Sequence, residues 1–110
     1  MQLCGDAIFE TTGIRPVMFR APVGLANPFV HTAAQRGGMK LLGWSASGWD
    51  GIAYDPDKVV SRILSDLSPG SIILLHDGKL KGMASGHRAT TLENLLISLK
   101  LAGFETTLPK

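Results

Sequence analysis

Three short segments carry the residues whose types and spacing could do chemistry. They are FRAPVG at 19–24, GWSASGWD at 43–50 and SIILLHDG at 71–78. His76 comes directly after the apolar run of the third segment, where a histidine is only partly solvated and suits proton transfer. A structural histidine bonded to a loop carbonyl is the alternative interpretation of this segment taken alone.

The first segment combines an arginine with a tight turn. Arg20 is followed by Ala-Pro-Val-Gly, and Pro22 and Gly24 favour a turn with a close backbone approach. Exposed N–H groups in such a turn can stabilise a developing oxyanion. An ordinary loop with a surface arginine is the alternative.

The second segment places two tryptophans and an aspartate in one loop. Trp44, Trp49 and Asp50 lie within seven residues of one another. Tryptophans at the mouth of a site suit stacking on sugars. They could equally cover the end of an incomplete core.

Alternating elements must position these segments. Short apolar runs predict strands and amphipathic periodicity predicts helices. The expected helices cover 2–10, 28–36, 56–67 and 90–102, and the expected strands cover 17–21, 39–46, 71–75 and 104–108. This alternation predicts an α/β fold, a parallel-sheet βα repeat in a single domain, 1–110. An eight-unit barrel takes ~250 residues and four strands cannot close one, so either the sheet is open or something else completes it.

Composition and charge exclude several function classes. Hydrophobic residues make up 45% of the 110 residues and charged residues 18%, which is a globular composition. The net charge is +2 with scattered basic residues, so neither a nucleic acid nor a membrane surface is an expected partner. The single cysteine, Cys4, excludes an internal disulfide, and no signal peptide is expected in the first ten residues.

The ordered set of segments resembles the last three of five motifs of the polysaccharide deacetylases. This is the NodB-homology family, or carbohydrate esterase family 4. FRAPVG is similar to the family's Arg-Pro-Pro-Tyr-Gly motif, GWSASGWD to its fourth motif with tryptophan and aspartate, and ILLHDG to its Leu-x-His motif. The resemblance implies the C-terminal part of a distorted (β/α) barrel. It also implies removal of an acetyl group from an N-acetylated, or sometimes an O-acetylated, sugar.

The resemblance also assigns expected roles to individual residues. His76 would be the general acid that protonates the leaving amine, and Arg20 would orient the catalytic aspartate. Leu74 would line the pocket for the acetyl methyl group. The backbone N–H of Val23 would serve an oxyanion hole, and Trp44 would wall the substrate groove.

Other positions of the same motifs carry expected roles or depart from the family. Asp50 fits the later aspartate of the fourth motif and counts as an expected catalytic residue, and Pro22 belongs to the substrate-binding turn. The aspartate that tunes the acid histidine in the family aligns with Ser47, which leaves the tuning of His76 open. The tryptophan that follows the later aspartate is Gly51 here.

The largest departure concerns the metal. In the family an aspartate and two histidines hold a divalent metal, usually zinc, and a second aspartate is the base. The motifs that supply them, Thr-Phe-Asp-Asp-Gly and His-x-x-x-His, do not occur in this sequence and are expected before Met1. A general acid contributes ~10²–10⁴ in rate, whereas a metal lowers the pKa of bound water from about 15.7 to ~7. We therefore expect this chain alone to hold no metal and to have no useful deacetylase activity.

Two other functions stay open on the sequence. The chain could be a non-catalytic carbohydrate-binding protein or a structural homo-oligomer, because a partial barrel exposes strand edges and apolar faces that self-association would cover. It could also be a different enzyme that combines His76 with residues of a partner. An N-acetylated oligosaccharide is the expected ligand in the deacetylase interpretation.

Overall fold

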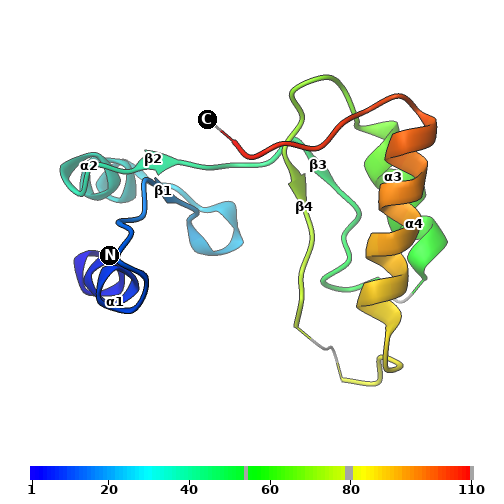
Figure 1. Cartoon of the computed structure of the whole chain (residues 1–110), viewed down its shortest axis with the longest axis horizontal. Helices are drawn as coiled ribbons and strands as arrows, with labels where there is room; N and C mark the ends of the chain where they lie inside the picture. Colours follow the sequence, from blue (N-terminus) through cyan, green and yellow to red (C-terminus); the bar gives the residue numbers. More distant parts are fainter. Residues whose placement is uncertain (54, 79–80, 110) are drawn as a thin grey trace. The chain divides into compact units, whose positions relative to one another are not determined.

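The computed structural model describes residues 1–53, 55–78 and 81–109. The chain divides into two compact units, Met1–Gly43 and Trp44–Lys110. Within the described residues, each unit holds two α-helices and one two-stranded parallel sheet (Figure 1). The single domain expected for residues 1–110 stays a prediction.

The first unit alternates helices with very short strands. Its elements are α1 (Gln2–Thr12), β1 (Met18–Phe19), the 3-10 helix η1 (Pro22–Gly24), α2 (Pro28–Arg36) and β2 (Lys40–Leu41). Strands β1 and β2 pair in parallel, with Met18 opposite Lys40 and Phe19 opposite Leu41.

Local signals in the sequence set the helix ends of the first unit. The Asn27 side chain accepts a hydrogen bond from the Val30 N–H at 2.9 Å, and Pro28 occupies the first turn of α2. Gly13 ends α1 with a φ of 72°, a left-handed conformation that glycine adopts without steric cost. Both helices therefore confirm the sequence prediction.

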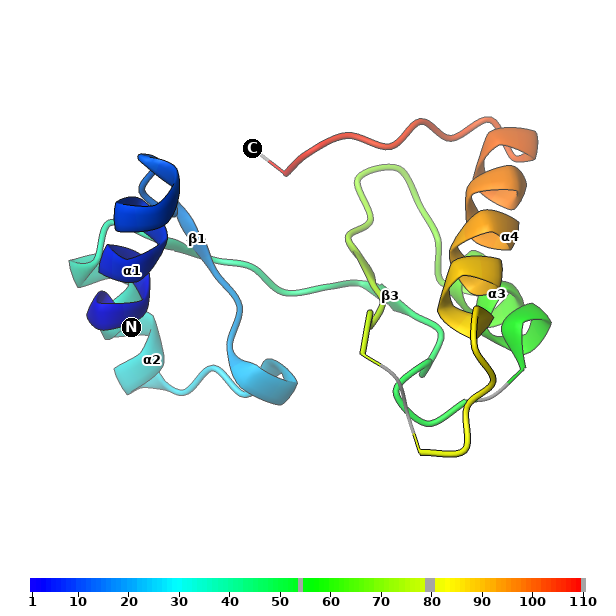
Figure 2. The same ribbon diagram turned by 60° about the horizontal axis from the view of Figure 1, so that its bottom comes forward.

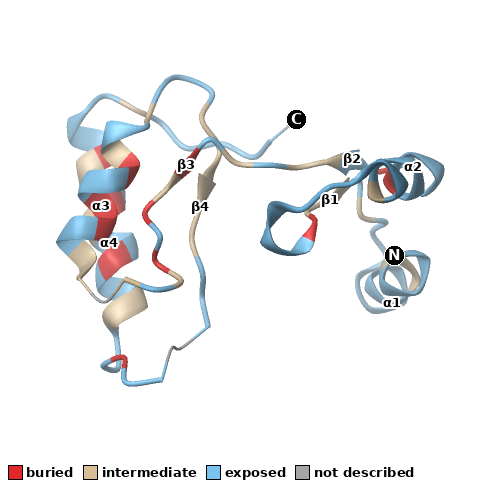
Figure 3. Ribbon diagram, turned by 180° about the vertical axis from the view of Figure 1, so that it is seen from behind, coloured by how far each residue is buried: buried red, intermediate tan, exposed pale blue. Residues whose placement is uncertain are grey.

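The first unit buries little apolar surface. Its buried hydrophobic side chains are Ala21, Ala34 and Met39, and helix α1 has no buried residue (Figure 3). Leu3 on α1 is 87% exposed. The hydrophobic effect therefore contributes little to the stability of this unit.

The second unit alternates short strands with helices that bury more apolar residues than those of the first unit. Its elements are β3 (Ala46–Ser47), α3 (Pro56–Ser65), β4 (Ile73–Leu74) and α4 (His87–Leu101). Strands β3 and β4 pair in parallel, with Ala46 opposite Ile73 and Ser47 opposite Leu74. The Asp55 carboxylate caps α3 by accepting hydrogen bonds from the N–H groups of Asp57 and Lys58.

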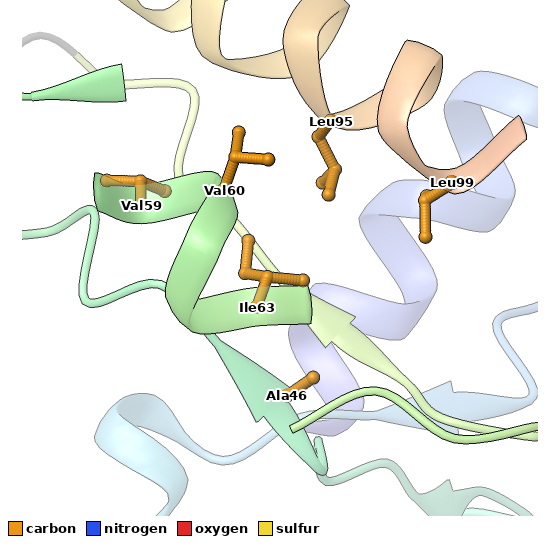
Figure 4. Close-up of a cluster of buried hydrophobic side chains, with 6 residues drawn as sticks. All are labelled: Ala46, Val59, Val60, Ile63, Leu95 and Leu99. Carbon is orange, nitrogen blue, oxygen red and sulfur yellow. The ribbon is translucent and has the colours of Figure 1, made fainter. Parts of the chain in front are cut away.

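The core of the second unit lies between β3, α3 and α4. Helices α3 and α4 lie side by side in both ribbon views, and their apolar side chains meet (Figures 2 and 4). The buried cluster consists of Ala46, Val59, Val60, Ile63, Leu95 and Leu99. The helices expected at 56–67 and 90–102 supply five of these six side chains.

The expected strands at 17–21 and 71–75 are shorter in the structure, and three other expected elements differ more. The strand predicted over 39–46 divides into the whole of β2 and the first residue of β3, which belong to separate sheets. Residues 104–109 form no strand, because the Phe104 N–H turns back to the Leu99 carbonyl at 2.9 Å. Helix α4 begins at His87, three residues before the helix expected at 90–102, and the Thr90 N–H donates to the Gly86 carbonyl inside it.

The fold class is the expected one at the level of α/β with short parallel strands. Among the described residues, no helix is both long enough and apolar enough to cross a membrane.

Candidate functional site: a histidine, aspartate and arginine cluster

His76 and Asp50 meet at the ends of paired strands. His76 comes two residues after β4 and Asp50 three residues after β3, and carboxyl ends of parallel strands meet at one edge of a sheet. The Asp50 Oδ1 lies 2.9 Å from the His76 Nδ1. The backbone N–H of His76 donates to the Asp50 Oδ2 at 2.7 Å. Asp50 therefore holds both the backbone and the ring of His76.

The two partners differ in burial. The Asp50 side chain is 2% exposed and the His76 side chain 52%. A buried carboxylate is costly unless hydrogen bonds and an opposite charge compensate it. The half-exposed ring can reach a ligand through Nε2 while Nδ1 faces the buried carboxylate.

Arg88, at the start of α4, supplies the opposite charge. Its Nη1 donates at 2.7 Å both to the Asp50 Oδ2 and to the Asp50 backbone carbonyl. Its Nε donates to the Gly78 carbonyl at 3.1 Å. The arginine thus connects the segment after β3 with the segment after β4.

The loop before Asp50 has an unusual backbone. Trp49 has a φ of 57°, in a region where non-glycine residues cost about 1–3 kcal/mol. Gly48 lies so close to α3 that an added Cβ would be 2.4 Å from the Val59 Cγ1. Gly51 lies against the imidazole, since a Cβ there would be 3.4 Å from the His76 Cε1. This tight turn carries Asp50 back under the histidine.

An open cavity adjoins the cluster on the α4 side. Its volume is about 280 Å³. It is lined by Asp50, Leu75, His76, Asp77, Arg88, Ala89, Thr91 and Leu92. The cavity therefore combines one buried ion pair with apolar walls.

Two further expected residues of the second unit lie on or beside its strands. Leu74 forms the end of β4, opposite Ser47, and Trp44 lies half-buried just before β3. Their expected substrate contacts stay predictions.

Three expected residues belong to the first unit. The Arg20 Nη2 donates to the Gly43 carbonyl at 3.4 Å. Pro22 opens η1, and Val23 follows it with a φ of 50° and an exposure of 83%. The tight turn expected here is present, because Gly24 and Leu25 donate back to the carbonyls of Ala21 and Pro22. The roles assigned to these residues stay predictions.

The structure pairs His76 with a residue other than the one at the aligned tuning position, and it adds one residue to the cluster. The motif resemblance aligns Ser47 with the aspartate that tunes the histidine, but Asp50 is the residue that contacts His76, and the Ser47 Oγ accepts the Trp49 N–H. Arg88 was not singled out from the sequence. Arg88 lies before the helix expected at 90–102 and 38 residues from Asp50, so no local signal in the sequence marked it.

The donor set does not fit the family's metal. Within the ranges 1–53, 55–78 and 81–109, no three side chains of His, Cys, Asp or Glu gather where they could hold a metal ion. Asp50 already accepts hydrogen bonds from the His76 N–H and Arg88. No chemical step at this cluster is therefore assigned to a metal.

Comparison with known proteins identifies deacetylases that are similar to this chain in sequence. No family model matches it. It is 30% identical over 98 residues to a chitooligosaccharide deacetylase of Bradyrhizobium, which covers 82% of this chain and 45% of the relative. It is 29% identical over 99 residues to the peptidoglycan-N-acetylglucosamine deacetylase PgdA of Listeria monocytogenes, covering 90% of this chain and 19% of the relative.

Solved structures share the fold. A family 4 carbohydrate esterase pseudoenzyme from Bacillus anthracis superposes with a TM-score of 0.79 at 23% identity, over 94% of this chain and 34% of that one. The chain thus spans less than half the length of each of these relatives.

Together these findings define a homologue of the carbohydrate deacetylases, which are hydrolases. More narrowly, the chain is similar in sequence to deacetylases named for chitooligosaccharide and peptidoglycan N-acetylglucosamine, and it shares the fold of a family 4 carbohydrate esterase structure.

Proposed function

We propose that this chain carries the general-acid part of an N-acetyl-sugar deacetylase. The contact between the Asp50 Oδ1 and the His76 Nδ1, at 2.9 Å, is the observation that carries the proposal. A carboxylate on Nδ1 holds a proton there and leaves Nε2 as the end of the ring that can exchange a proton with a substrate. The names of both sequence relatives, which act on chitooligosaccharide and peptidoglycan N-acetylglucosamine, support an N-acetylated sugar as the substrate.

The role of His76 follows from the chemistry of amide hydrolysis. Water adds to the acetyl carbonyl, and the C–N bond then breaks to give acetate and an amine. An amine leaves readily only when it takes up a proton as the bond breaks. The imidazolium of His76 donates that proton from Nε2, and the half-exposed ring is accessible to a sugar.

The activation of water is assigned to residues outside this chain. The family is generally metal-dependent, but the described residues offer no group of ligands. We therefore infer that the chain alone has no useful activity, and that its strands form part of a (β/α) barrel whose remaining strands come from elsewhere.

A chimera tests the acid role directly. The segment of the Bradyrhizobium deacetylase that matches this chain would be replaced by this chain, and acetate release from N-acetyl-chito-oligosaccharides would be measured with zinc present. We expect activity that falls about 10²–10⁴-fold in the His76→Ala variant, the usual contribution of a general acid. His31→Ala is the matched control, because His31 is an exposed histidine on α2.

Two results would contradict the proposal. An active chimera whose activity is equal with and without His76 would remove the acid role. Acetate release by the isolated chain, dependent on metal and on His76, would contradict the inference that the chain alone is inactive.

Self-association is a second proposed property, and the exposed apolar side chains favour it. Leu3, Phe29 and Leu101 are each more than four-fifths exposed. Contact between copies of the chain would remove this apolar surface from water. Light scattering at micromolar concentration would check this, and a monodisperse monomer would contradict a homo-oligomer.

A further inference from the structure

Arg88 is the charged group that contacts the buried end of the His76–Asp50 pair. It lies in the first turn of α4, its side chain is 16% exposed, and it donates three hydrogen bonds, two of them to Asp50. An arginine at a helix start is unfavourably placed in the helix dipole. Its position therefore calls for a compensating role, and the contacts with Asp50 supply one.

The contacts of Arg88 constrain the carboxylate in two ways. By bonding the Asp50 backbone carbonyl as well as Oδ2, the guanidinium fixes the main chain and the side chain of the same residue. The Oδ2 also accepts the His76 N–H at 2.7 Å. With Oδ2 held by two donors, Oδ1 is the oxygen that faces the imidazole.

We propose that Arg88 is a positioning residue that fixes the Asp50 carboxylate and thereby keeps the proton of the neutral His76 ring on Nδ1. This inference rests on the proposed function for its biological meaning, because only a ring with Nδ1 protonated presents Nε2 to a leaving amine. Arg88 touches no reacting atom in this scheme and acts through Asp50. The anchoring of its Nε on the Gly78 carbonyl keeps the guanidinium in place.

Removal of the arginine has a definite physical consequence. A carboxylate that is 2% exposed and has lost its positive partner is strongly destabilised. It turns towards solvent or takes up a proton, and either change weakens the bond to the His76 Nδ1. Without the carboxylate on Nδ1, the neutral ring has no partner that holds its proton there, so part of the His76 population carries the proton on Nε2 instead.

The test is long-range ¹H–¹⁵N NMR of the whole chain, which distinguishes a proton on Nδ1 from one on Nε2. Spectra are recorded at a pH at which the ¹⁵N shifts show that the ring is neutral. In the wild-type chain we expect the Nδ1–H form of His76 to dominate. In Arg88→Met we expect the ratio of Nδ1–H to Nε2–H to fall about tenfold, the size of the effect of one hydrogen bond to a charged group.

Three variants keep the test interpretable. Arg62→Met is the matched control, since it removes an exposed arginine from α3 with the same change in charge and leaves the ratio unchanged. Arg88→Lys retains the charge and shows a smaller fall. Asp50→Asn removes the charged acceptor itself and gives the fall expected for Arg88→Met, so it replaces Arg88→Met if that variant does not fold.

An unchanged or increased Nδ1–H ratio in folded Arg88→Met or in Asp50→Asn would overturn the proposal. So would a fall of the same size in Arg62→Met. The measurement does not depend on deacetylation. A tenfold fall in the ratio, together with an inactive chimera, would support the positioning role of Arg88 and count against the proposed function. An unchanged ratio, together with a chimera whose activity depends on His76, would count against the positioning role and support the proposed function.

Discussion

The two compact units differ in what holds them together. The second unit, Trp44–Lys110, has a buried apolar cluster to which one strand and two helices contribute. The first unit, Met1–Gly43, buries only Ala21, Ala34 and Met39 among its hydrophobic residues and leaves α1 without a buried residue. Both units have capped helices and a two-residue parallel pairing, so local signals alone do not explain the difference. The comparison shows that regular elements form from local sequence, whereas a core needs facing apolar stripes.

The largest expected effect comes from the core of the second unit. Ile63 is fully buried in the cluster, and Ile63→Ala is expected to lower the free energy of unfolding by about 2–5 kcal/mol. Leu3→Ala in the first unit removes the same number of side-chain atoms from a residue that is 87% exposed. This substitution is expected to change the free energy of unfolding by less than about 0.5 kcal/mol. Urea unfolding followed by circular dichroism measures both. Equal losses of unfolding free energy in the two variants would contradict the difference in packing between the two units.

A smaller effect is expected from a backbone contact in the second unit. Gly48→Ala places a Cβ 2.4 Å from the Val59 Cγ1 and 2.6 Å from its carbonyl oxygen, so the loop or α3 must shift. We expect a loss of about 1–3 kcal/mol, typical of overpacking. Gly43→Ala is the control, because nothing lies within 4 Å of a Cβ there. Thermal unfolding compares the two, and a neutral Gly48→Ala would show that the loop does not pack on α3.

The helix caps are expected to contribute similarly in both units. Asn27→Ala removes the acceptor for Val30, and Asp55→Ala removes the acceptor for Asp57 and Lys58. Each is expected to cost about 0.5–2 kcal/mol. Amide hydrogen exchange would detect the loss in the affected helix only. A loss of protection in both helices from one substitution would mean that the units unfold together.

The smallest effect is expected at the surface of the first unit. The Arg15–Asp6 ion pair spans 3.1 Å, but its side chains are 65% and 47% exposed. Arg15→Gln is therefore expected to cost between about 0 and 1 kcal/mol, and less at high salt. Urea unfolding at low and high salt would check this. A loss of unfolding free energy above that range would mean that this ion pair stabilises the first unit more than its exposure predicts.

The helices were predictable from the sequence because their signals are local. Asn27-Pro28 and Asp55-Pro56 each mark a helix start, and apolar periodicity defined the faces that form the core. The strands were predicted too long, because strand length depends on pairing partners elsewhere in the chain. The run at 39–46 has suitable residues throughout, yet it pairs with β1 at one end and with β4 at the other.

The candidate site was predictable only in part. His76 stood out because it follows an apolar run and Asp50 because it fits the fourth motif, and the structure brings the two together. Asp50 rather than Ser47 contacts His76 because of the turn at Trp49, and no residue type in the sequence indicates that turn. Arg88 lies 38 residues from Asp50 in the chain, and long-range pairs of this kind are set by the packing of α4.

The turn at Gly48 and Trp49 has a consequence for how this chain could vary. Gly48 has no room for a side chain, while Trp49 occupies a conformation that glycine would adopt more easily. Exchanging these two neighbours would leave the composition and the net charge of the chain untouched. It would nevertheless place an indole against Val59 and leave the backbone before Asp50 unrestrained. The structure of this loop therefore depends on the order of two adjacent residues, which the amino-acid composition of the chain does not specify.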